Sequence, residues 1–172
     1  DTSAIRQAIR HLAALGHRQI GFASGPLRFI PSRDKTEAYI ETMRQILPNE
    51  KPRVVHALYT VSGGQSAAAQ LITSGCTAII CGSDIMAFGA IRHCKAAGLS
   101  VPHDVSVVGF DDSPVTGFAD PPLTTLRQPV KNMSEAAVTT LLAMIQGAPA
   151  HVGKMRFEPE LIVRESTAVR RT

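Results

Sequence analysis

Residues 105–126 of this 172-residue chain read VSVVGFDDSPVTGFADPPLTTL. The apolar, β-branched start of the stretch predicts a buried strand that stops at Gly109, shortly before the consecutive carboxylates Asp111 and Asp112. In an open parallel sheet, side chains at the carboxyl ends of strands line the crevice where ligands bind. Asp111 is therefore a candidate for binding the polar groups of a small molecule. The alternative is structural, because Asp followed by Ser113-Pro114 is also ordinary turn chemistry.

Strand-like and helix-like segments alternate on the N-terminal side of this stretch. Apolar residues at spacings of three and four mark the helices, and Gly or Pro ends most segments. We expect strands at 18–24, 54–58, 77–81 and 105–109, and helices at 2–15, 35–47, 62–74 and 84–97, with Ser62 and Gln65 forming a capping box. This alternation predicts an α/β fold, a doubly wound parallel sheet between two helical layers.

The pattern changes after Pro121-Pro122. Residues 123–127 resemble a strand, 132–145 a helix with Asn132 and Glu135 at capping positions, 147–153 a loop, and 157–163 an edge strand containing Pro159. One strand and one helix cannot bury their own apolar face. This piece therefore either packs on the first unit or belongs to a second domain whose remainder is missing.

Composition limits the class of protein. With 44% hydrophobic residues the chain can bury a core. Its net charge of +4 comes from scattered basic residues, and the sequence contains no nucleic-acid-binding motif. Cys76, Cys81 and Cys94 have no metal-ligand spacing and read as reduced core thiols. Together with the absence of a targeting or membrane-spanning pattern, they favour a cytoplasmic location. Asp1 opens directly into a helical pattern, which suggests a piece of a longer protein.

Motifs for catalysis and cofactors are missing. The sequence has no phosphate-binding glycine loop, no GxSxG nucleophile elbow, and no histidine spacing suited to a metal. Asp111 and Asp112 would point to opposite sides of a strand, so they do not form an acid and base pair on one substrate. We therefore expect a protein that is not an enzyme and binds no cofactor and no metal.

Candidate ligand-binding residues follow the ends of the predicted strands. They are Phe29, Arg33 and Lys35 after the first strand, Leu58 and Tyr59 after the second, Ser83 and Asp84 after the third, and Asp111 after the fourth. Each has a structural alternative: the charges can be plain surface, Ser83 and Asp84 can cap a helix, and Tyr59 can cover the core. Together they predict a polar small-molecule pocket in a binding protein.

Four segments carry a resemblance to a known family. They are LAALGHRQIGFAS (12–24), AIICGSDIMAFGAIRHCKAAG (78–98), VPHDVSVVGFDDSPVTGFADPPLTTLRQP (101–129) and LIVREST (161–167). The chain resembles the effector-binding region of LacI/GalR-family transcriptional regulators, whose fold is similar to that of periplasmic sugar-binding proteins. The resemblance implies a C-terminal subdomain at 17–120 and 154–172. It implies parts of an N-terminal subdomain at 1–16 and 121–153, with a DNA-binding headpiece outside this chain.

The same resemblance implies roles for single residues. Asp111 would hydrogen-bond effector hydroxyl or ring nitrogen atoms, Ser83 and Asp84 would lie at the pocket wall, and Gln128 would lie near a crossover between the subdomains. The family usually places an arginine three residues before a glycine-aromatic pair; here Lys35, Ala38 and Tyr39 take those positions. Lysine offers a point charge instead of a planar fork, and Arg33 would compensate only if its loop shifted.

The resemblance also implies partners. A homodimer would use Met86, Ala90, His93 and Cys94 on the helix after residue 84, and Phe118 in the loop 115–120. The expected function is a sensory module: a sugar or similar metabolite closes a cleft between the subdomains and changes how the dimer presents its headpieces to operator DNA. The alternative is a sugar-binding protein of a transport system.

Overall fold

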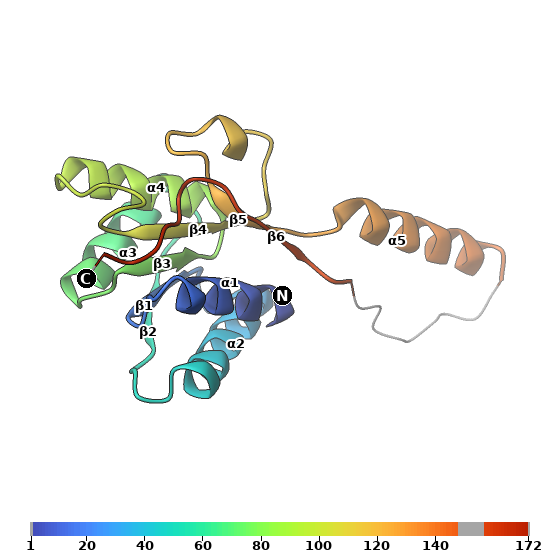
Figure 1. The fold of residues 1–172 in the computed structure, drawn as a ribbon. Helices are drawn as coiled ribbons and strands as arrows, with labels where there is room; N and C mark the ends of the chain where they lie inside the picture. Colours follow the sequence, from blue (N-terminus) through green and yellow to red (C-terminus); the bar gives the residue numbers. More distant parts are fainter. Residues whose placement is uncertain (1, 148–156, 172) are drawn as a thin grey trace.

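The computed structural model describes residues 2–147 and 157–171, which form alternating helices and strands around one sheet (Figure 1). The helices are α1 (Thr2–Ala14), α2 (Ile30–Ile46), α3 (Val61–Thr73), α4 (Asp84–Ala96) and α5 (Val130–Ile145), with a short 3-10 helix at Thr116–Phe118. The strands are β1 (Ile20–Ser24), β2 (Arg53–His56), β3 (Ala78–Cys81), β4 (Ser106–Phe110), β5 (Thr124–Arg127) and β6 (Glu160–Ile162).

The sheet has the strand order β2-β1-β3-β4-β5-β6. Strands β1 to β5 pair in parallel, and β6 joins β5 antiparallel at the edge, with Leu126 opposite Leu161. Because parallel neighbours run in one direction, the carboxyl ends of β1, β2, β3 and β4 lie at the same edge of the sheet. Every residue that follows one of these strands is thereby brought to that edge.

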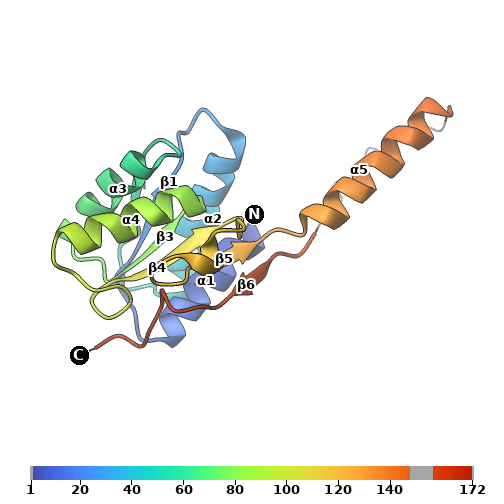
Figure 2. The same cartoon turned by 90° about the horizontal axis from the view of Figure 1, so that it is seen from above.

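Each face of the sheet has its own core. Phe22, Ile80 and Val108 pack with α1 and α2, whereas their sequence neighbours Ile79 and Val107 pack with α3 and α4. Successive strand residues point to opposite faces, so strands covered on both sides must be apolar at nearly every position. The predicted doubly wound α/β sheet between two helical layers is confirmed, and Figure 2 shows the layers from above.

Helix α1 belongs to the first of these cores. Its side chains Ile5, Ile9 and Leu12 are fully buried against residues of α2 and the sheet. The resemblance assigned residues 1–16 to the N-terminal subdomain, but this packing groups α1 with the sheet that residues 17–120 build. The predicted boundary between residues 153 and 154, and most of the predicted loop 147–153, lie outside the described residues.

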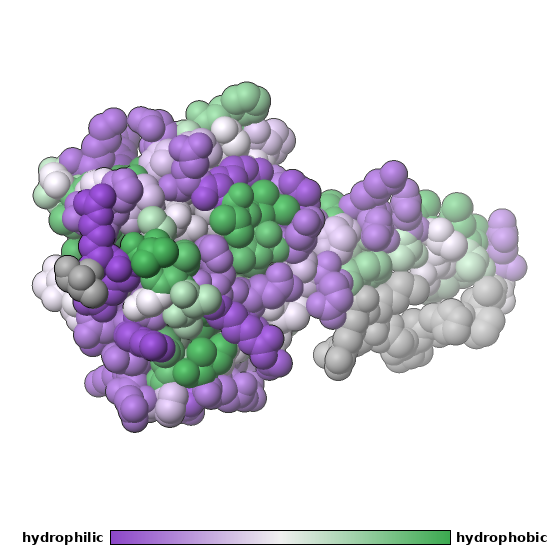
Figure 3. Space-filling view, viewed as in Figure 1, coloured by the Kyte–Doolittle hydropathy of each residue, from purple (hydrophilic) through white to green (hydrophobic). Residues whose placement is uncertain are grey.

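Helix α5 projects away from this body. None of its residues is buried, and apolar side chains such as Val138, Leu141 and Ile145 are 56%, 57% and 73% exposed. Figure 3 shows apolar and polar side chains side by side on this projecting helix. The chain leaves the body through β5 and returns through β6, so these two paired strands are the connection between α5 and the sheet (Figure 1).

A buried histidine organises the opposite edge of the sheet. The His17 ring is hydrogen-bonded to Thr77 (2.9 Å) and Ser106 (3.0 Å), and to the carbonyl oxygen of Ala168 (3.1 Å) in the C-terminal tail. His11 reaches the same tail at Thr167 (3.0 Å). Burial lowers the pKa of both histidines, so the imidazoles are neutral groups that join the tail to the body.

Three local predictions are corrected. Helix α2 begins at Ile30 instead of after residue 34, because Pro31 is suited to a first helical turn, so Arg33 is helical instead of lying in a loop. Thr60 caps α3 by accepting from the amide of Gly63, in place of the predicted Ser62–Gln65 box. Helix α5 starts at Val130 with Pro129 at its cap position and no side-chain cap bond, so Asn132 and Glu135 do not cap it. The cap of α4 by Ser83 is confirmed.

Candidate functional site

Lys35 lies at the centre of the sheet edge where the parallel strands end. Its side chain is only 6% exposed, its Nζ lies 3.6 Å from the centre of the Phe110 ring, and it donates to the carbonyl oxygen of Gly82 at 3.4 Å. Desolvation lowers the pKa of the ammonium group, and the charge of Asp111 opposes that shift. One cation from α2 therefore contacts the ends of both β3 and β4.

Asp111 follows β4 and carries a carboxylate whose charge acts on Lys35. Its Oδ1 accepts a hydrogen bond from Nε2 of Gln128 at 3.0 Å, and the residue is exposed to solvent. Neighbouring atoms partly desolvate the carboxyl and raise its pKa, while Gln128 and Lys35 act in the opposite direction. A carboxylate beside an ammonium and an amide offers acceptors and donors to a polar ligand.

Tyr59 forms the aromatic side of the same edge. Its hydroxyl hydrogen-bonds Ser32 of α2 at 2.8 Å, and its ring lies 6.4 Å from that of Phe29, which is 42% exposed. A methyl group at Gly25 would overlap the Tyr59 ring, so glycine at the end of β1 is what lets the ring lie there. Aromatic faces next to hydroxyl-binding groups suit a ligand with both polar and apolar faces.

The remaining predicted ligand-binding residues are either exposed or engaged in capping a helix. Arg33 is exposed on α2 and the side chain of Leu58 is 55% exposed beside Tyr59 in sequence. Ser83 accepts from the amide of Met86 at 3.3 Å, which is the capping role that the sequence left open. The structure thus brings together Lys35, Asp111, Gln128, Tyr59 and Phe29, and it keeps Ser83 engaged at the start of α4.

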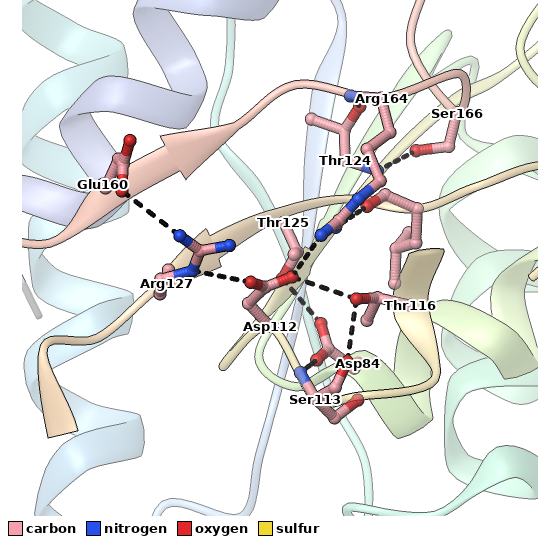
Figure 4. Close-up of polar contacts among 11 residues, drawn as sticks. Asp84, Asp112, Ser113, Thr116, Thr124, Thr125, Arg127, Glu160, Arg164 and Ser166 are labelled. Carbon is pink, nitrogen blue, oxygen red and sulfur yellow. Dashed lines mark hydrogen bonds and ion pairs between the residues drawn. The ribbon is translucent and has the colours of Figure 1, made fainter. Parts of the chain in front are cut away.

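Asp84 is a buried support for the turn that carries Asp111. It is 2% exposed, its Oδ1 accepts from Thr125 at 2.6 Å, and its Oδ2 accepts from the amide of Ser113 at 2.7 Å (Figure 4). Burial raises the pKa of this carboxyl, and the two hydrogen bonds oppose the shift. Both carboxylate oxygens have partners within the chain. Asp84 therefore stabilises the turn after β4 and does not present a free carboxylate to a ligand.

Sequence reasoning missed the network around Asp112. Its Oδ2 accepts from Nε of Arg127 at 2.7 Å and its Oδ1 accepts from Nη2 of Arg164 at 2.8 Å and from Thr116 at 2.9 Å (Figure 4). Desolvation raises the pKa of this carboxyl, but the hydrogen bonds from the two arginines and Thr116 outweigh it and hold the pKa below its usual value. Both arginines lie far from Asp112 in the sequence, so no short sequence motif could have predicted these hydrogen bonds.

The predicted dimer residues divide into two groups. Met86, Ala90 and Cys94 are fully buried in the core between α3, α4 and the sheet, so the prediction is corrected for these three side chains. They occupy the inner face of α4 because that face covers the sheet. His93 is half-buried, and Phe118 is 92% exposed in the loop before β5.

Residues 9–167 match a family described as the periplasmic binding protein-like domain. The chain belongs to this family. This periplasmic binding protein-like domain is 53% identical to the HTH-type transcriptional regulator MalR of Streptomyces coelicolor, a match that covers 98% of the chain and 50% of the relative. It is 34% identical to the transcriptional repressor CytR of Escherichia coli over 97% of the chain and 50% of that relative. The chain thus spans about half the length of these regulators, and the relatives are regulators, not enzymes.

A solved structure of the dimeric lac repressor superposes on the domain with a TM-score of 0.91 at 29% identity, covering 99% of this chain and 62% of that one. A complex of the transcriptional regulator CelR with cellobiose superposes with a TM-score of 0.88 at 31% identity, covering 96% and 51%. The predicted likeness to LacI/GalR regulators is confirmed. Among residues 2–147 and 157–171, no helix is long and apolar enough to span a membrane.

Proposed function

We propose that this domain is the effector-binding part of a LacI-type transcriptional regulator and that it binds a small sugar at the edge formed by Lys35, Asp111 and Gln128. The observation that carries the proposal is the convergence of an ammonium, a carboxylate and an amide at the ends of three parallel strands. Such crevices at strand ends are the usual ligand sites of open α/β sheets. DNA binding through a headpiece is part of the same proposal for the whole protein.

The chemistry of the edge favours a neutral sugar. Hydroxyl groups can donate to Asp111 and accept from Lys35 and Gln128, and the apolar face of a sugar ring can stack on an aromatic side chain such as Phe29. Leu27 and Ile30, 50% and 61% exposed, flank Phe29 in the sequence and add apolar surface beside it. The cellobiose complex of the similar regulator CelR supports a sugar over an anionic metabolite.

Dimerisation is the second part of the proposal. Ile85 is 50% exposed and Phe118 is 92% exposed, while Phe88 is half-buried and Arg92 exposed on the outer face of α4. Residues 85, 88 and 92 follow helical spacing on one face, so they form a surface that the buried Met86, Ala90 and Cys94 cannot provide. The likeness to the dimeric lac repressor supports dimerisation, and the exposure of these residues is the reason for assigning the contact to this surface.

A cytoplasmic location completes the regulator proposal. The three cysteines are free and buried, as suits a reducing compartment. The relatives named above are transcriptional regulators, which favours a regulator over the sugar-binding protein of a transport system.

Isothermal titration calorimetry of the whole protein with maltose, cellobiose, monosaccharides, sugar phosphates and purines tests the proposed site. We expect a neutral sugar to bind the wild type and Asp34→Asn, and binding to be lost in Asp111→Ala. Asp34 is a matched control because it is an exposed carboxylate next to Lys35 in α2. Sugar binding that survives Asp111→Ala would remove Asp111 from the site, and binding of only phosphates or purines would overturn the sugar class.

A further inference from the structure

One carboxylate holds both strands that connect α5 to the body. Asp112 is 7% exposed, and each of its oxygens accepts from a different guanidinium: Arg127, the last residue of β5, and Arg164, two residues after β6 (Figure 4). Strand β5 carries the chain out toward α5, and β6 carries it back. The two paths therefore meet at a single side chain that belongs to neither of them.

The two halves of this ionic contact differ in exposure and in their other hydrogen bonds. Arg164 also donates from Nη1 to the carbonyl oxygen of Leu123 at 2.7 Å, its amide donates to Thr124 at 2.9 Å, and its side chain is 21% exposed. Arg127 is 48% exposed, and its other contact is a 3.5 Å approach to Glu160, which is 68% exposed. Arg164 thus anchors Asp112 to the body, and Arg127 is the half that can move with the exit toward α5.

The contact is joined to the proposed ligand site through the backbone. Asp111 and Asp112 are consecutive, both have positive φ values (107° and 54°), and their partners Gln128 and Arg127 are consecutive as well. Positive φ is uncommon for residues other than glycine, although Asp tolerates it better than most, and contacts from neighbouring residues hold this turn in place. Asp84 does so at Ser113, and the amide of Asp111 donates to the carbonyl oxygen of Leu126 at 2.8 Å.

We propose that Asp112 is a positioning residue that sets the angle at which the chain leaves β5 toward α5. Through the 111–112 turn it transmits occupancy of the Asp111 site to that angle. The second statement rests on the proposed function, whereas the first concerns this chain alone. A ligand hydroxyl that binds Asp111 competes with Gln128 for the carboxylate. Any shift of the 111–112 turn then changes the contact between Asp112 and Arg127, the residue before Gln128.

A distance measurement between α3 and α5 tests the proposal. Spin labels are attached in the whole protein at Gln70→Cys and Ser134→Cys, two positions that are exposed in this domain, whose own three cysteines are buried. Pulsed electron resonance then reports the distance distribution without ligand and with maltose or cellobiose. We compare the wild type with Asp112→Asn, with Arg127→Gln, which alters only the exposed half, and with Glu160→Gln as the control.

We expect one narrow distance in the wild type and in Glu160→Gln, and loss of that narrow peak in folded Asp112→Asn and folded Arg127→Gln. A sugar that shifts the wild-type peak should still bind Asp112→Asn but produce no shift. A narrow, wild-type distance in both variants would overturn the proposal, as would a broadening that Glu160→Gln shares. If no sugar binds the wild type, the proposed function fails, and the ligand-free distances still decide the role of Asp112.

Discussion

The Oδ1 atom of Asp111 accepts a hydrogen bond from Gln128 at 3.0 Å, which joins the end of β4 to the residue where the chain leaves the sheet for α5. Lys35 adds a positive charge to the same edge and is itself held against Phe110 and Gly82. The carboxylate is thus preorganised before any ligand arrives, which lowers the cost of ordering the site on binding.

Replacing Asp111 with Asn is predicted to weaken sugar binding without unfolding the protein. Hydrogen bonds to charged groups contribute about 1.5–3 kcal/mol each, so the loss of one should weaken affinity roughly ten- to hundredfold. Calorimetric titration of Asp111→Asn against the Asp34→Asn control measures this change. Equal affinities in the two variants would contradict a direct contact with the carboxylate.

Lys35 is predicted to control the protonation of Asp111. The ammonium group lowers the pKa of the Asp111 carboxyl in opposition to desolvation, so Lys35→Met should raise that pKa further above its usual value. Nuclear magnetic resonance of the Asp111 carboxyl carbon during a pH titration follows the change directly. An unchanged titration would mean that Lys35 does not act on Asp111, and Lys51→Met, an exposed lysine before β2, serves as the control.

Gly25→Ala is predicted to disturb the aromatic side of the site. The added methyl group would overlap the Tyr59 ring, so the ring must move away from Phe29 and Ser32. Overpacking of this kind costs about 1–3 kcal/mol of stability, which urea unfolding can measure, and sugar affinity should fall with it. Gly117→Ala is the control, because the nearest atom to a methyl group there is 3.9 Å away on Arg164.

Stability is predicted to fall in mild acid because of His17. Desolvation, with the charges of Arg170 and His11, keeps its pKa below 6.5, although the bond to Ala168 acts in the opposite direction. The unfolded chain then binds more protons than the folded chain once the pH falls below 6.5. The stabilisation is full above that pH and is lost progressively toward the lower folded pKa. Urea unfolding as a function of pH should show a shallower acid slope for His17→Gln than for the exposed control His103→Gln, and equal slopes would contradict the assignment.

Phe118→Asp is predicted to dissociate the proposed dimer. A carboxylate at a side chain that is 92% exposed costs the monomer little but would be desolvated in an apolar contact. Sedimentation of the whole protein should show a monomer for Phe118→Asp and for Ile85→Asp. Val169→Asp, which is 69% exposed near the C-terminus, should remain a dimer. A dimer that survives both substitutions would place the contact elsewhere.

The sheet could be predicted from the sequence because its central strands β1, β3 and β4 are covered on both faces. Segments such as 78–81 and 106–110 must then be apolar nearly throughout, and the helices between them show periodic apolar positions. The position of Asp111 after β4 followed from the same pattern. Its closeness to Lys35 did not, because Lys35 was expected at the start of a helix with a surface charge as the alternative, and it is instead buried one turn inside α2.

The rest depended on contacts between distant segments. Met86, Ala90 and Cys94 were assigned to a surface because an apolar helical stripe does not reveal whether it faces the sheet or a partner. Asp112 was interpreted only as the neighbour of Asp111, since its partners Arg127 and Arg164 approach through the tertiary fold. The structural role of a buried polar group such as Asp84 can be recognised only when the fold has shown which residues donate hydrogen bonds to it.

The most direct test of the sugar site is a crystal structure of the whole protein with the sugar that binds it best. The account predicts a sugar hydroxyl within hydrogen-bond distance of the Asp111 carboxylate, with a second polar contact to Lys35 or Gln128. A sugar bound away from the carboxyl ends of β3 and β4, with no sugar hydroxyl near the Asp111 carboxylate, would contradict it.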